Sequence, residues 1–277
     1  MHRPRLWLLL VPALAACSGN AAPSGTATPS GSPPSEPSPA PAVVLAPPAP
    51  PGSSWQYQLQ GSADLSVRAT LYDLDGFATS VATVAAIHAD HHYALCYLNA
   101  GAWESFRPDA STYPASILGK AYAGYPDERW LDIRNQASLR PILLARLRTQ
   151  CKAKGFDGVE WDNVEAYNQA TGFAITADDQ LRFNRWLAQA THEAGLRVAL
   201  KNDRDQVALL APAFDYAVDE ECQQYDECAK LEPFVAAHKA VFDVEYVAAN
   251  YACPGPRGIS VILKSRDLYA QPRQSCR

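Results

Sequence analysis

Histidine is scarce in this 277-residue chain, which contains only six, and no HxH or HExxH motif occurs. A zinc hydrolase is therefore disfavoured, because histidines at such spacings usually bind its metal. The chain has no GxSxG elbow and no P-loop, and no GxGxxG follows the first predicted strand. These absences disfavour serine hydrolases, nucleotide hydrolases and dinucleotide-binding enzymes. No basic tract interleaved with aromatic residues occurs, so nucleic acid is not an expected partner.

The composition indicates a folded and mildly acidic protein. Apolar residues make up 48% of the chain, and its length is enough for one large domain or two small ones with a buried core. The formal net charge is −5. This acidic excess is compatible with a cationic substrate, although most acidic proteins use such a charge only for solubility.

The N-terminus resembles a bacterial lipoprotein signal. Arg3 and Arg5 precede the apolar run LWLLLVPALAA, which is too short to span a bilayer as a stable helix. The run leads into LAAC, which resembles a lipobox and implies cleavage before Cys17 and attachment of lipid to its sulfur. We expect a signal peptide over residues 1–16 and an exported protein that is lipid-anchored to the membrane of the cell envelope. An ordinary signal peptide with an incidental cysteine is the alternative.

Ala, Pro, Ser, Gly and Thr predominate in the next segment, residues 17–53. A segment of this composition cannot bury enough apolar surface to fold. We expect it to be an extended linker that holds a folded domain, residues 54–277, away from the membrane.

Six cysteines follow the lipobox: Cys96, Cys151, Cys222, Cys228, Cys253 and Cys276. An even number in an exported chain favours disulfide bonds. Cys222 and Cys228 flank a predicted loop, and a bond between Cys253 and Cys276 would hold the C-terminal tail. That choice leaves Cys96 for Cys151, but six cysteines allow 15 connectivities and the sequence does not select one. Free buried thiols are the alternative, and a zinc site is disfavoured because paired CxxC motifs are absent.

Strand-like runs alternate with helical patterns in the folded part. The predicted strands cover residues 68–74, 93–99, 129–133, 156–161, 196–201, 214–219, 240–247 and 258–264. Clear helical patterns cover residues 138–155 and 177–195, and the second ends at Gly195, a common helix stop. Eight strands alternating with helices in this length predict a (β/α)8 TIM barrel in one domain. An open doubly wound sheet is the alternative.

Polar residues share one face of these strands near their carboxyl ends. In a barrel, alternate strand residues point inward, and catalytic groups lie at the carboxyl ends of the strands. Alternation places these residues on that face: Asp73, Asp75, Tyr97, Asn99, Trp130, Asp132, Arg134, Glu160, Asp162, Lys201, Asp243 and Glu245. The opposite faces are apolar and suit packing against helices. The pattern therefore predicts a wet cleft on one rim of the barrel.

The sixth predicted strand departs from this pattern. Glu220 shares its parity with Tyr216 and Val218, so it would enter the cleft only from a loop beyond the strand or through a bulge. Alternation does not decide between Asp219, Glu220 and Glu221.

The predicted rim is rich in carboxylates, and two carboxylates that face each other across a cleft are the minimal equipment for glycoside hydrolysis. One donates a proton to the leaving oxygen, and the other attacks the sugar or activates water. Aromatic side chains for stacking on sugar rings are available at Tyr97, Trp130, Trp161, Tyr167, Tyr225 and Tyr246. Core packing is the simpler explanation for each of these aromatics alone.

Eight motifs over residues 55–276 together resemble one family. They are WQYQLQG, YDLDGF, CYLNAGAWESFRPD, ERWLDIR, GFDGVEWDNVEAY, GLRVALKND, FDYAVDEECQQYDEC and VFDVEY, in this order. Their combination resembles glycoside hydrolase family 114, which comprises endo-α-1,4-polygalactosaminidases and related barrel proteins. No single motif is specific, but the ordered set is.

The resemblance implies a barrel that cleaves α-1,4-linked galactosamine polymers of exopolysaccharide. It implies that Asp162 and Glu220 are the catalytic pair, and it favours a disulfide between Cys222 and Cys228. It further implies that the groove is lined by Asp73, Tyr97, Glu160, Asn163, Lys201, Asn202 and Glu245. Asp162 would be the nucleophile or general base and Glu220 the general acid. Retention or inversion of configuration depends on their separation, which the sequence does not give.

The sequence therefore predicts an endo-acting glycoside hydrolase for a cationic amino-sugar polymer. We expect a monomer that needs no cofactor and no metal ion. One alternative is a non-catalytic barrel that binds such a glycan at the cell envelope. Another is a metal-dependent hydrolase that uses Asp73, Asp75, Glu160 and Asp162.

Overall fold

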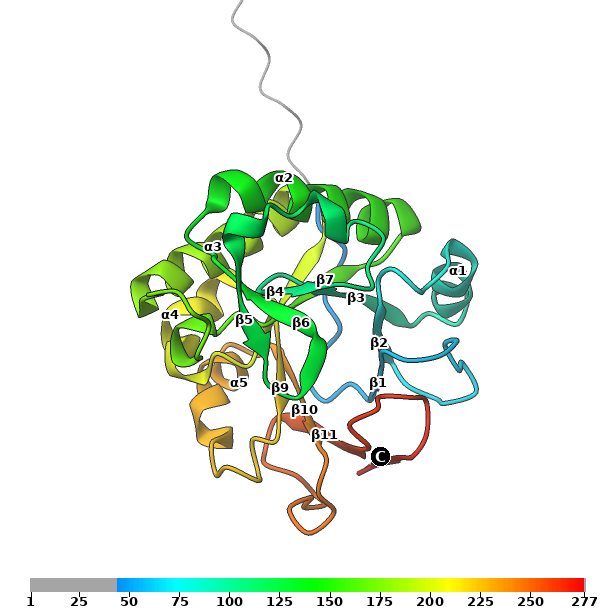
Figure 1. Cartoon of the computed structure of the whole chain (residues 1–277). Helices are drawn as coiled ribbons and strands as arrows, with labels where there is room; N and C mark the ends of the chain where they lie inside the picture. The colour runs from blue at the N-terminus through cyan, green and yellow to red at the C-terminus, as the bar shows by residue number, and fades with distance from the viewer. Residues whose placement is uncertain (1–43, 277) are drawn as a thin grey trace, which may run out of the picture. The chain divides into compact units, whose positions relative to one another are not determined.

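Eight parallel strands form the barrel of the computed structural model, which describes residues 44–276 (Figure 1). In hydrogen-bonded order they are β1 (Trp55–Gln58), β2 (Leu71–Asp75), β3 (Tyr93–Asn99), β7 (Gly158–Asp162), β8 (Arg197–Lys201), β9 (Tyr216–Glu220), β10 (Ala240–Glu245) and β11 (Ile259–Lys264). A short strand, β12 (Arg273–Ser275), pairs antiparallel with β11. The predicted (β/α)8 barrel is thus confirmed.

Side chains join the two ends of the sheet, where β1 comes next to β11. The indole Nε1 of Trp55 donates to the carbonyl oxygen of Ser260 (2.9 Å), and Nζ of Lys264 donates to Oε1 of Gln56 (3.2 Å). From β12, the guanidinium of Arg273 donates to the carbonyl oxygen of Trp55 (2.7 Å). This seam of the barrel therefore depends on a few long polar side chains.

Helices cover the outside of the barrel: α1 (Val81–Ala89), α2 (Gln136–Arg146), α3 (Ala177–Glu193), α4 (Val207–Leu210) and α5 (Glu232–Ala236). The predicted helix over 177–195 is confirmed as α3. It starts with a capping box, in which Thr176 and Asp179 each accept the other's backbone N–H, and Gly195 follows it with φ 76°. The predicted helix over 138–155 continues after α2 as a wider π turn (Leu147–Cys151) and then a tighter 3₁₀ turn (Lys152–Lys154).

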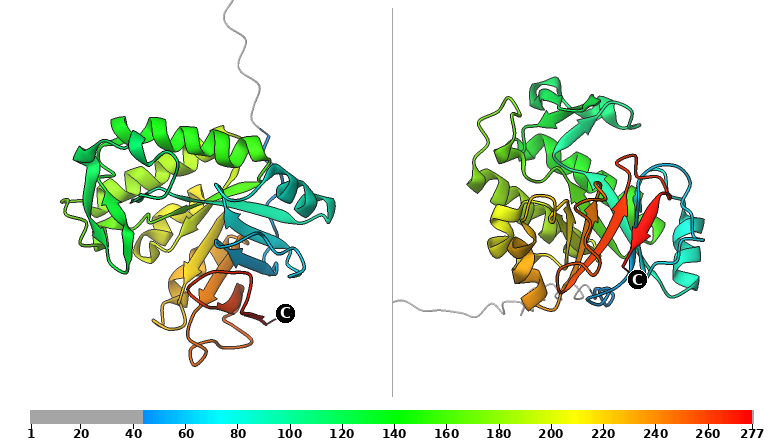
Figure 2. Two further views of the ribbon diagram at one scale, coloured as in Figure 1. Left: turned by 45° about the vertical axis from the view of Figure 1, so that its right-hand side comes forward. Right: turned by 90° about the horizontal axis from the view of Figure 1, so that it is seen from below.

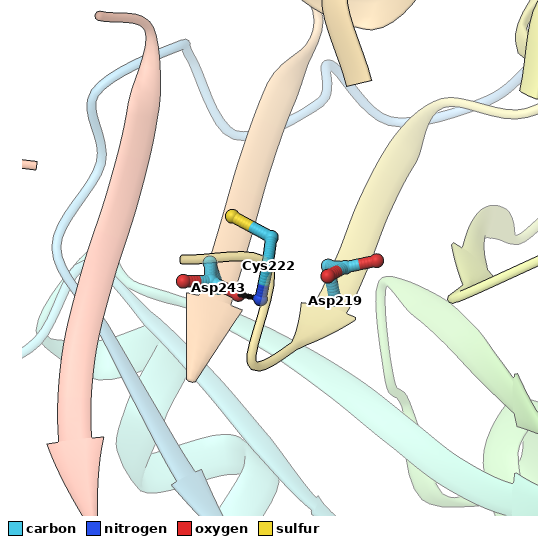
Figure 3. Close-up of side chains that lie close together, drawn as sticks. All are labelled: Asp219, Cys222 and Asp243. Atoms are coloured by element: carbon cyan, nitrogen blue, oxygen red, sulfur yellow. Dashed lines mark hydrogen bonds between the residues drawn. The ribbon is translucent and has the colours of Figure 1, made fainter. Parts of the chain in front are cut away.

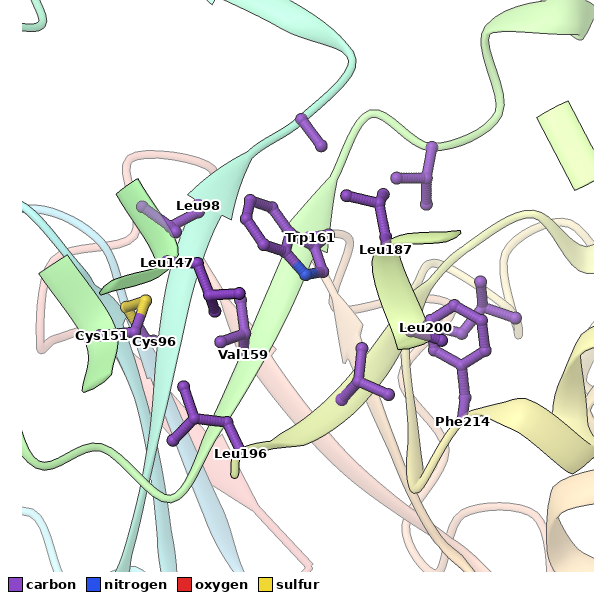
Figure 4. Close-up of a cluster of buried hydrophobic side chains, with 14 of the residues drawn as sticks. Cys96, Leu98, Leu147, Cys151, Val159, Trp161, Leu187, Leu196, Leu200 and Phe214 are labelled. Atoms are coloured by element: carbon purple, nitrogen blue, oxygen red, sulfur yellow. A yellow bond between two sulfur atoms is a disulfide. The ribbon is translucent and has the colours of Figure 1, made fainter. Parts of the chain in front are cut away.

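The outward faces of the strands pack against these helices (Figure 4). Figure 4 shows Trp161 of β7 beside Leu187 of α3, and the Trp161 indole donates to the hydroxyl of Thr191 on the same helix (2.9 Å). The same layer contains Val159 and Leu200, as the alternation predicted. Helix packing therefore uses the faces that are opposite to the predicted cleft.

A second apolar cluster fills the interior of the barrel, and it corrects the predicted facing of two strands. Tyr216 and Val218 of β9 and Phe242 and Val244 of β10 belong to this inner cluster. Glu220 therefore faces inward as the last residue of β9, opposite Val244, without a bulge or a loop. Asp243 and Glu245 lie on the outer face of β10, so their predicted place on the inner rim is wrong. The prediction from alternation failed here because it assumed that polar residues face inward, whereas the inward residues of these two strands are apolar except for Glu220 at the end of β9.

The predicted third barrel strand, residues 129–133, belongs instead to a separate antiparallel sheet. This small sheet contains β4 (Ala102–Glu104), β5 (Leu118–Tyr122) and β6 (Tyr125–Leu131) and is inserted between β3 and α2. Figure 2 shows it to one side of the barrel strands. Alternation identifies a strand but does not distinguish a barrel strand from an inserted one. The barrel strand that the sequence did not predict is β1. Two of the four residues in its WQYQ run are polar glutamines, although all four residues are buried.

Three disulfide bonds join Cys96 to Cys151, Cys222 to Cys228 and Cys253 to Cys276. The first fixes β3 to the turn that follows α2, and the second joins two cysteines six positions apart in the loop after β9. These are the pairs that the sequence suggested, the first of them only as the pair that remained, and a structure with three disulfides is typical of an exported protein.

The end of the predicted linker contacts the barrel. The backbone N–H of Ala49 donates to the hydroxyl of Tyr216 (2.9 Å), and Ala49 is only 2% exposed. The signal peptide and Cys17 lie outside the described residues. Within residues 44–276, no helix has both the length and the apolar character needed to cross a bilayer.

Candidate active site

The ammonium group of Lys201 lies at the centre of the polar rim. Its Nζ is 3.2 Å from Oε1 of Glu160, 3.1 Å from Oδ1 of Asp162 and 3.3 Å from Oε2 of Glu220. It also donates to the hydroxyl of Tyr57 (3.1 Å). Burial alone would lower the pKa of this lysine, but the three carboxylates around it, Asp162 foremost, raise its pKa well above the ordinary value. Lys201 therefore carries a fixed positive charge between the two predicted catalytic residues.

Asp162 and Glu220 are each held by further donors. The hydroxyl of Tyr97 donates to Oδ2 of Asp162 (2.7 Å), and the backbone N–H of Asn163 donates to Oδ1 (2.8 Å). The hydroxyl of Tyr246 donates to Oε1 of Glu220. At the same strand end, Oδ1 of Asn202 accepts the backbone N–H of Glu220 (3.0 Å). These contacts fix both carboxylates at the carboxyl ends of β7 and β9.

A buried acid pair lies beneath this centre. Asp73 of β2 and Glu160 of β7 are both fully buried, and their carboxyl groups are close enough to affect each other's pKa. Burial raises the pKa of both, and the charge of Glu160 raises the pKa of Asp73 further, whereas the charge of Lys201 opposes the rise at Glu160. The protonation of one carboxyl group therefore depends on that of the other, and Glu160 is the one that contacts Lys201 (3.2 Å).

The cleft above Lys201 has a volume of about 380 Å³. One wall contains Arg107, whose guanidinium forms ion pairs with Asp75 (2.6 Å) and Glu104 (2.8 Å). The small inserted sheet contributes Tyr122, Tyr125 and Glu128 to the lining, and the loop after β11 contributes Arg266, Asp267 and Leu268. The cleft thus combines carboxylates with aromatic rings, which is the surface that sugar rings use.

Several of the sequence-predicted residues line this cleft. They are Asp75, Tyr97, Asp162, Asn163, Lys201, Asn202 and Glu220. Asp73, Glu160 and Tyr246 lie directly behind these residues, within their hydrogen-bond network.

Other predicted residues lie outside the cleft. Trp130 stacks beneath Tyr122 with its ring centroid at 4.6 Å, so it supports a lining residue rather than lining the cleft itself. Asn99 is buried and its Oδ1 accepts the backbone N–H of Ala102 (2.8 Å). Asp132 forms a bidentate pair with Arg134 beyond the end of β6.

Two more predicted residues serve neighbouring loops. Tyr167 follows the barrel strand β7, and burial together with the nearby charge of Asp203 raises the pKa of its hydroxyl. Glu245 accepts the backbone N–H of Gln223 (2.7 Å) from the outer side of β10, and so holds the loop that follows Glu220. Their contacts indicate positioning of loops rather than contact with a ligand in the cleft.

An acidic cluster beside this loop has the spacing of a metal site (Figure 3). It contains Asp219, Cys222 and Asp243, all buried. However, the sulfur of Cys222 is bonded to Cys228, and Asp219 accepts from the guanidinium of Arg204 (3.0 Å). Asp243 accepts the backbone N–H of Cys222, as the dashed line in Figure 3 shows (3.2 Å). This disulfide bond and these hydrogen bonds favour a structural role for the cluster, which holds the loop after β9 in place.

The geometry also disfavours the metal-dependent alternative for the rim. A metal bound by Asp73, Asp75, Glu160 and Asp162 would have to share the space between them with the Lys201 ammonium. Asp75 already pairs with Arg107 (2.6 Å), and the Lys201 ammonium already contacts both Glu160 and Asp162. The described donor set therefore fits a fixed ammonium group rather than a divalent cation.

The sequence did not identify several residues of the site, and five of them show why. Tyr57 lies on the missed strand β1, and Arg107, Tyr122 and Glu128 belong to the insertion whose strands were assigned to the barrel or left out. Arg266 lies in the loop after β11 and stacks on the ring of Tyr246 (4.6 Å). The motifs WQYQLQG and ERWLDIR contain Tyr57 and Glu128. The polar residues in these two motifs were the only feature of the sequence that could have indicated these two site residues.

Comparison with known proteins agrees with this geometry. The model of glycoside hydrolase family GH114 matches residues 35–277. The chain belongs to this family. The structure of Ega3 from Aspergillus fumigatus, solved in complex with galactosamine, is 30% identical, with a TM-score of 0.80 over 86% of this chain and all of that one. The glycoside hydrolase domain of PelA from Pseudomonas aeruginosa shares the fold at 14% identity, with a TM-score of 0.62 over 81% of this chain and 99% of that one. A search of curated proteins gave no match.

Membership of the family makes this chain a glycoside hydrolase and an enzyme, as the motifs predicted. Its disulfide bonds indicate an exported protein.

Proposed function

We propose that this member of the GH114 family is an endo-acting hydrolase of α-1,4-linked, galactosamine-containing exopolysaccharide. The observation that carries the proposal is the contact of one ammonium group, that of Lys201, with both Asp162 and Glu220 at the head of an acidic, aromatic-lined cleft. The galactosamine bound in the Ega3 structure supports the choice of an amino sugar.

In the proposed reaction, Glu220 protonates the glycosidic oxygen and Asp162 attacks the anomeric carbon. Because Lys201 contacts both, the nearest oxygens of the two carboxylates are at most about 6.4 Å apart. We propose a retaining mechanism, in which Glu220 then activates water to release the sugar from Asp162. Proton NMR of the first product should show the α anomer, and initial formation of the β anomer would exclude this mechanism.

The first test of the proposal uses amide variants. Asp162→Asn and Glu220→Gln should each lower kcat on de-N-acetylated galactosaminan by at least about a thousandfold, because each removes a group that forms or breaks a bond in the reaction. New reducing ends report the cleavage. Asp132→Asn is the matched control, since Asp132 was predicted on the rim but pairs with Arg134 and is not among the residues that line the cleft.

The outcomes separate the two functions that the sequence left open. Loss of cleavage in both amide variants, with full activity in the control, supports the catalytic pair. Binding of galactosaminan by the wild-type protein without new reducing ends would favour a glycan-binding barrel instead.

We further propose that lipid on Cys17 anchors the enzyme to the cell envelope and that it acts as a monomer. The lipobox-like LAAC supports the anchor. Cys17→Ser should move the protein from the membrane fraction to the soluble fraction, and an unchanged distribution would contradict the anchor. Light scattering of the soluble form measures its oligomeric state.

A further inference from the structure

Two carboxylates face each other across the small inserted sheet, but only one of them has a cationic partner. Glu104 of β4 lies directly opposite Glu128 of β6 in the antiparallel register. Arg107 and Arg146 lie 2.8 Å and 3.5 Å from the carboxylate of Glu104. Within residues 44–276, no lysine, arginine or histidine forms an ion pair with Glu128. Like charges directly opposite each other destabilise a sheet, so a cation bound at Glu128 would stabilise this one.

Glu128 faces the cleft and lies within electrostatic range of the catalytic centre. It lines the cleft together with Tyr122 and Tyr125. Burial, then the charges of Glu104 and Asp162, raise its pKa to about 8, and Asp127 adds to the rise. Arg107 is the one group that opposes this rise, and its guanidinium is already bound to Asp75 and Glu104.

A second acid of the lining, Glu165, has different surroundings. Burial raises its pKa to about 7, and the charge of Arg204 opposes this rise. Glu165 follows β7 in a loop, whereas Glu128 lies directly opposite a second carboxylate in a sheet. Asp267 is exposed to solvent, which already screens its charge. A cation from a ligand would therefore relieve a like-charge contact at Glu128.

We propose that Glu128 binds the ammonium group at C2 of a galactosamine residue and so selects a de-N-acetylated residue at the subsite it faces. The inference rests on the proposed function, since it assumes an amino-sugar polymer in the cleft. An acetamido group is neutral and larger, so it would leave the carboxylate without a counter-charge and crowd it against Glu104. The rings of Tyr122 and Tyr125, beside Glu128, supply the apolar surface against which the sugar ring would stack.

The test compares Glu128→Gln with Asp127→Asn. Asp127 is the adjacent residue of β6, is exposed and does not line the cleft, so its variant makes the matching carboxyl-to-amide change outside the site. On fully de-N-acetylated galactosaminan, Glu128→Gln should lower kcat/KM by about tenfold to a hundredfold, the range for losing a hydrogen bond to a charged group. On the re-N-acetylated polymer its kcat/KM should stay within about twofold of wild type, and Asp127→Asn should match wild type on both.

A fall in kcat/KM that is equal on both polymers, or no fall on either, would overturn the role of Glu128 while the proposed function stands. If the wild-type enzyme cleaves neither polymer, the proposed function is wrong, and calorimetry with a galactosamine oligosaccharide then decides the inference. Weaker binding by Glu128→Gln than by Asp127→Asn would support it, and equal binding would reject it. Thermal melting shows whether Glu128→Gln folds, and Glu128→Asp, which keeps the charge, should recover part of the preference.

Discussion

Lys201 and Lys264 are both buried at the carboxyl ends of barrel strands, but their surroundings differ in charge. Lys201 is 2% exposed and Lys264 is 3% exposed. Lys201 faces three carboxylates, whereas Lys264 donates to Oε1 of Gln56 and to the carbonyl oxygens of Tyr269 and Ala270. Burial and the charge of Arg273 lower the pKa of Lys264 to about 8, while the carboxylates raise the pKa of Lys201.

The difference shows how the same residue type serves two purposes in one barrel. A buried ammonium group loses its hydration, and only nearby negative charge restores a comparable stabilisation. The negative charge around Lys201 belongs to the groups that would act on the substrate. The acceptors around Lys264 are neutral, and they belong to the seam where β11 meets β1. Lys201 therefore belongs to the active site, and Lys264 to the framework.

The largest effect on this comparison is expected from Lys201→Met. Removal of the shared cation leaves Glu160, Asp162 and Glu220 close together without a counter-charge. We expect kcat to fall by about a hundredfold to a thousandfold, as on loss of a transition-state stabiliser, and the free energy of unfolding to fall by about 3–5 kcal/mol, as for a broken buried ion pair. Reducing-end assays and urea unfolding measure the two quantities.

Activity has to be measured well below the melting temperature of the variant, so that unfolded protein does not account for the loss. Lys201→Arg is the companion variant, because it keeps the charge but changes the geometry of the donors. A Lys201→Met variant with wild-type kcat and wild-type stability would remove the distinction between the two lysines.

The sequence could identify Lys201 but not Lys264. Lys201 follows Ala199 on a strand with clear alternation, and it lies in the motif GLRVALKND. Lys264 ends the predicted strand 258–264, where a lysine ordinarily indicates an exposed strand end. Its burial depends on a tail, residues 265–276, that folds back over β1, and such a long-range contact leaves no periodic signal.

The same limit explains the other differences between the sequence and the structure. Alternation located Asp75, Asp162 and Lys201 correctly, because the strands that carry them change from apolar to polar on their inner face. It misplaced Asp243 and Glu245, whose side chains hold a loop from the outer face of β10. The inserted sheet, with Glu128 on it, was missed because the pattern of a strand does not tell which sheet the strand joins.

A smaller effect is expected from Lys264→Met. The substitution deprives the oxygens of Gln56, Tyr269 and Ala270 of their shared donor, and each buried unsatisfied acceptor destabilises the fold. We expect the free energy of unfolding at pH 7 to fall by about 1–3 kcal/mol, with kcat within about twofold of wild type because no reacting group is touched. Urea unfolding and reducing-end assays test both parts. A loss of kcat as large as that of Lys201→Met would mean that the seam and the active site are coupled.

The smallest effect concerns the pH dependence of stability. Because the pKa of Lys264 is about 8 in the folded protein and about 10.4 in the unfolded chain, the unfolded state binds more protons between these values. The wild-type protein should therefore gain stability relative to Lys264→Met as the pH rises through 8 toward 10, whereas below pH 8 their difference should be constant. The other groups that titrate in this range are common to both proteins and cancel in the difference. Urea unfolding of both proteins at pH 7 and pH 9 measures the difference in their free energies of unfolding. An equal difference at the two pH values would show that the pKa of Lys264 is not lowered and that the two buried lysines titrate alike.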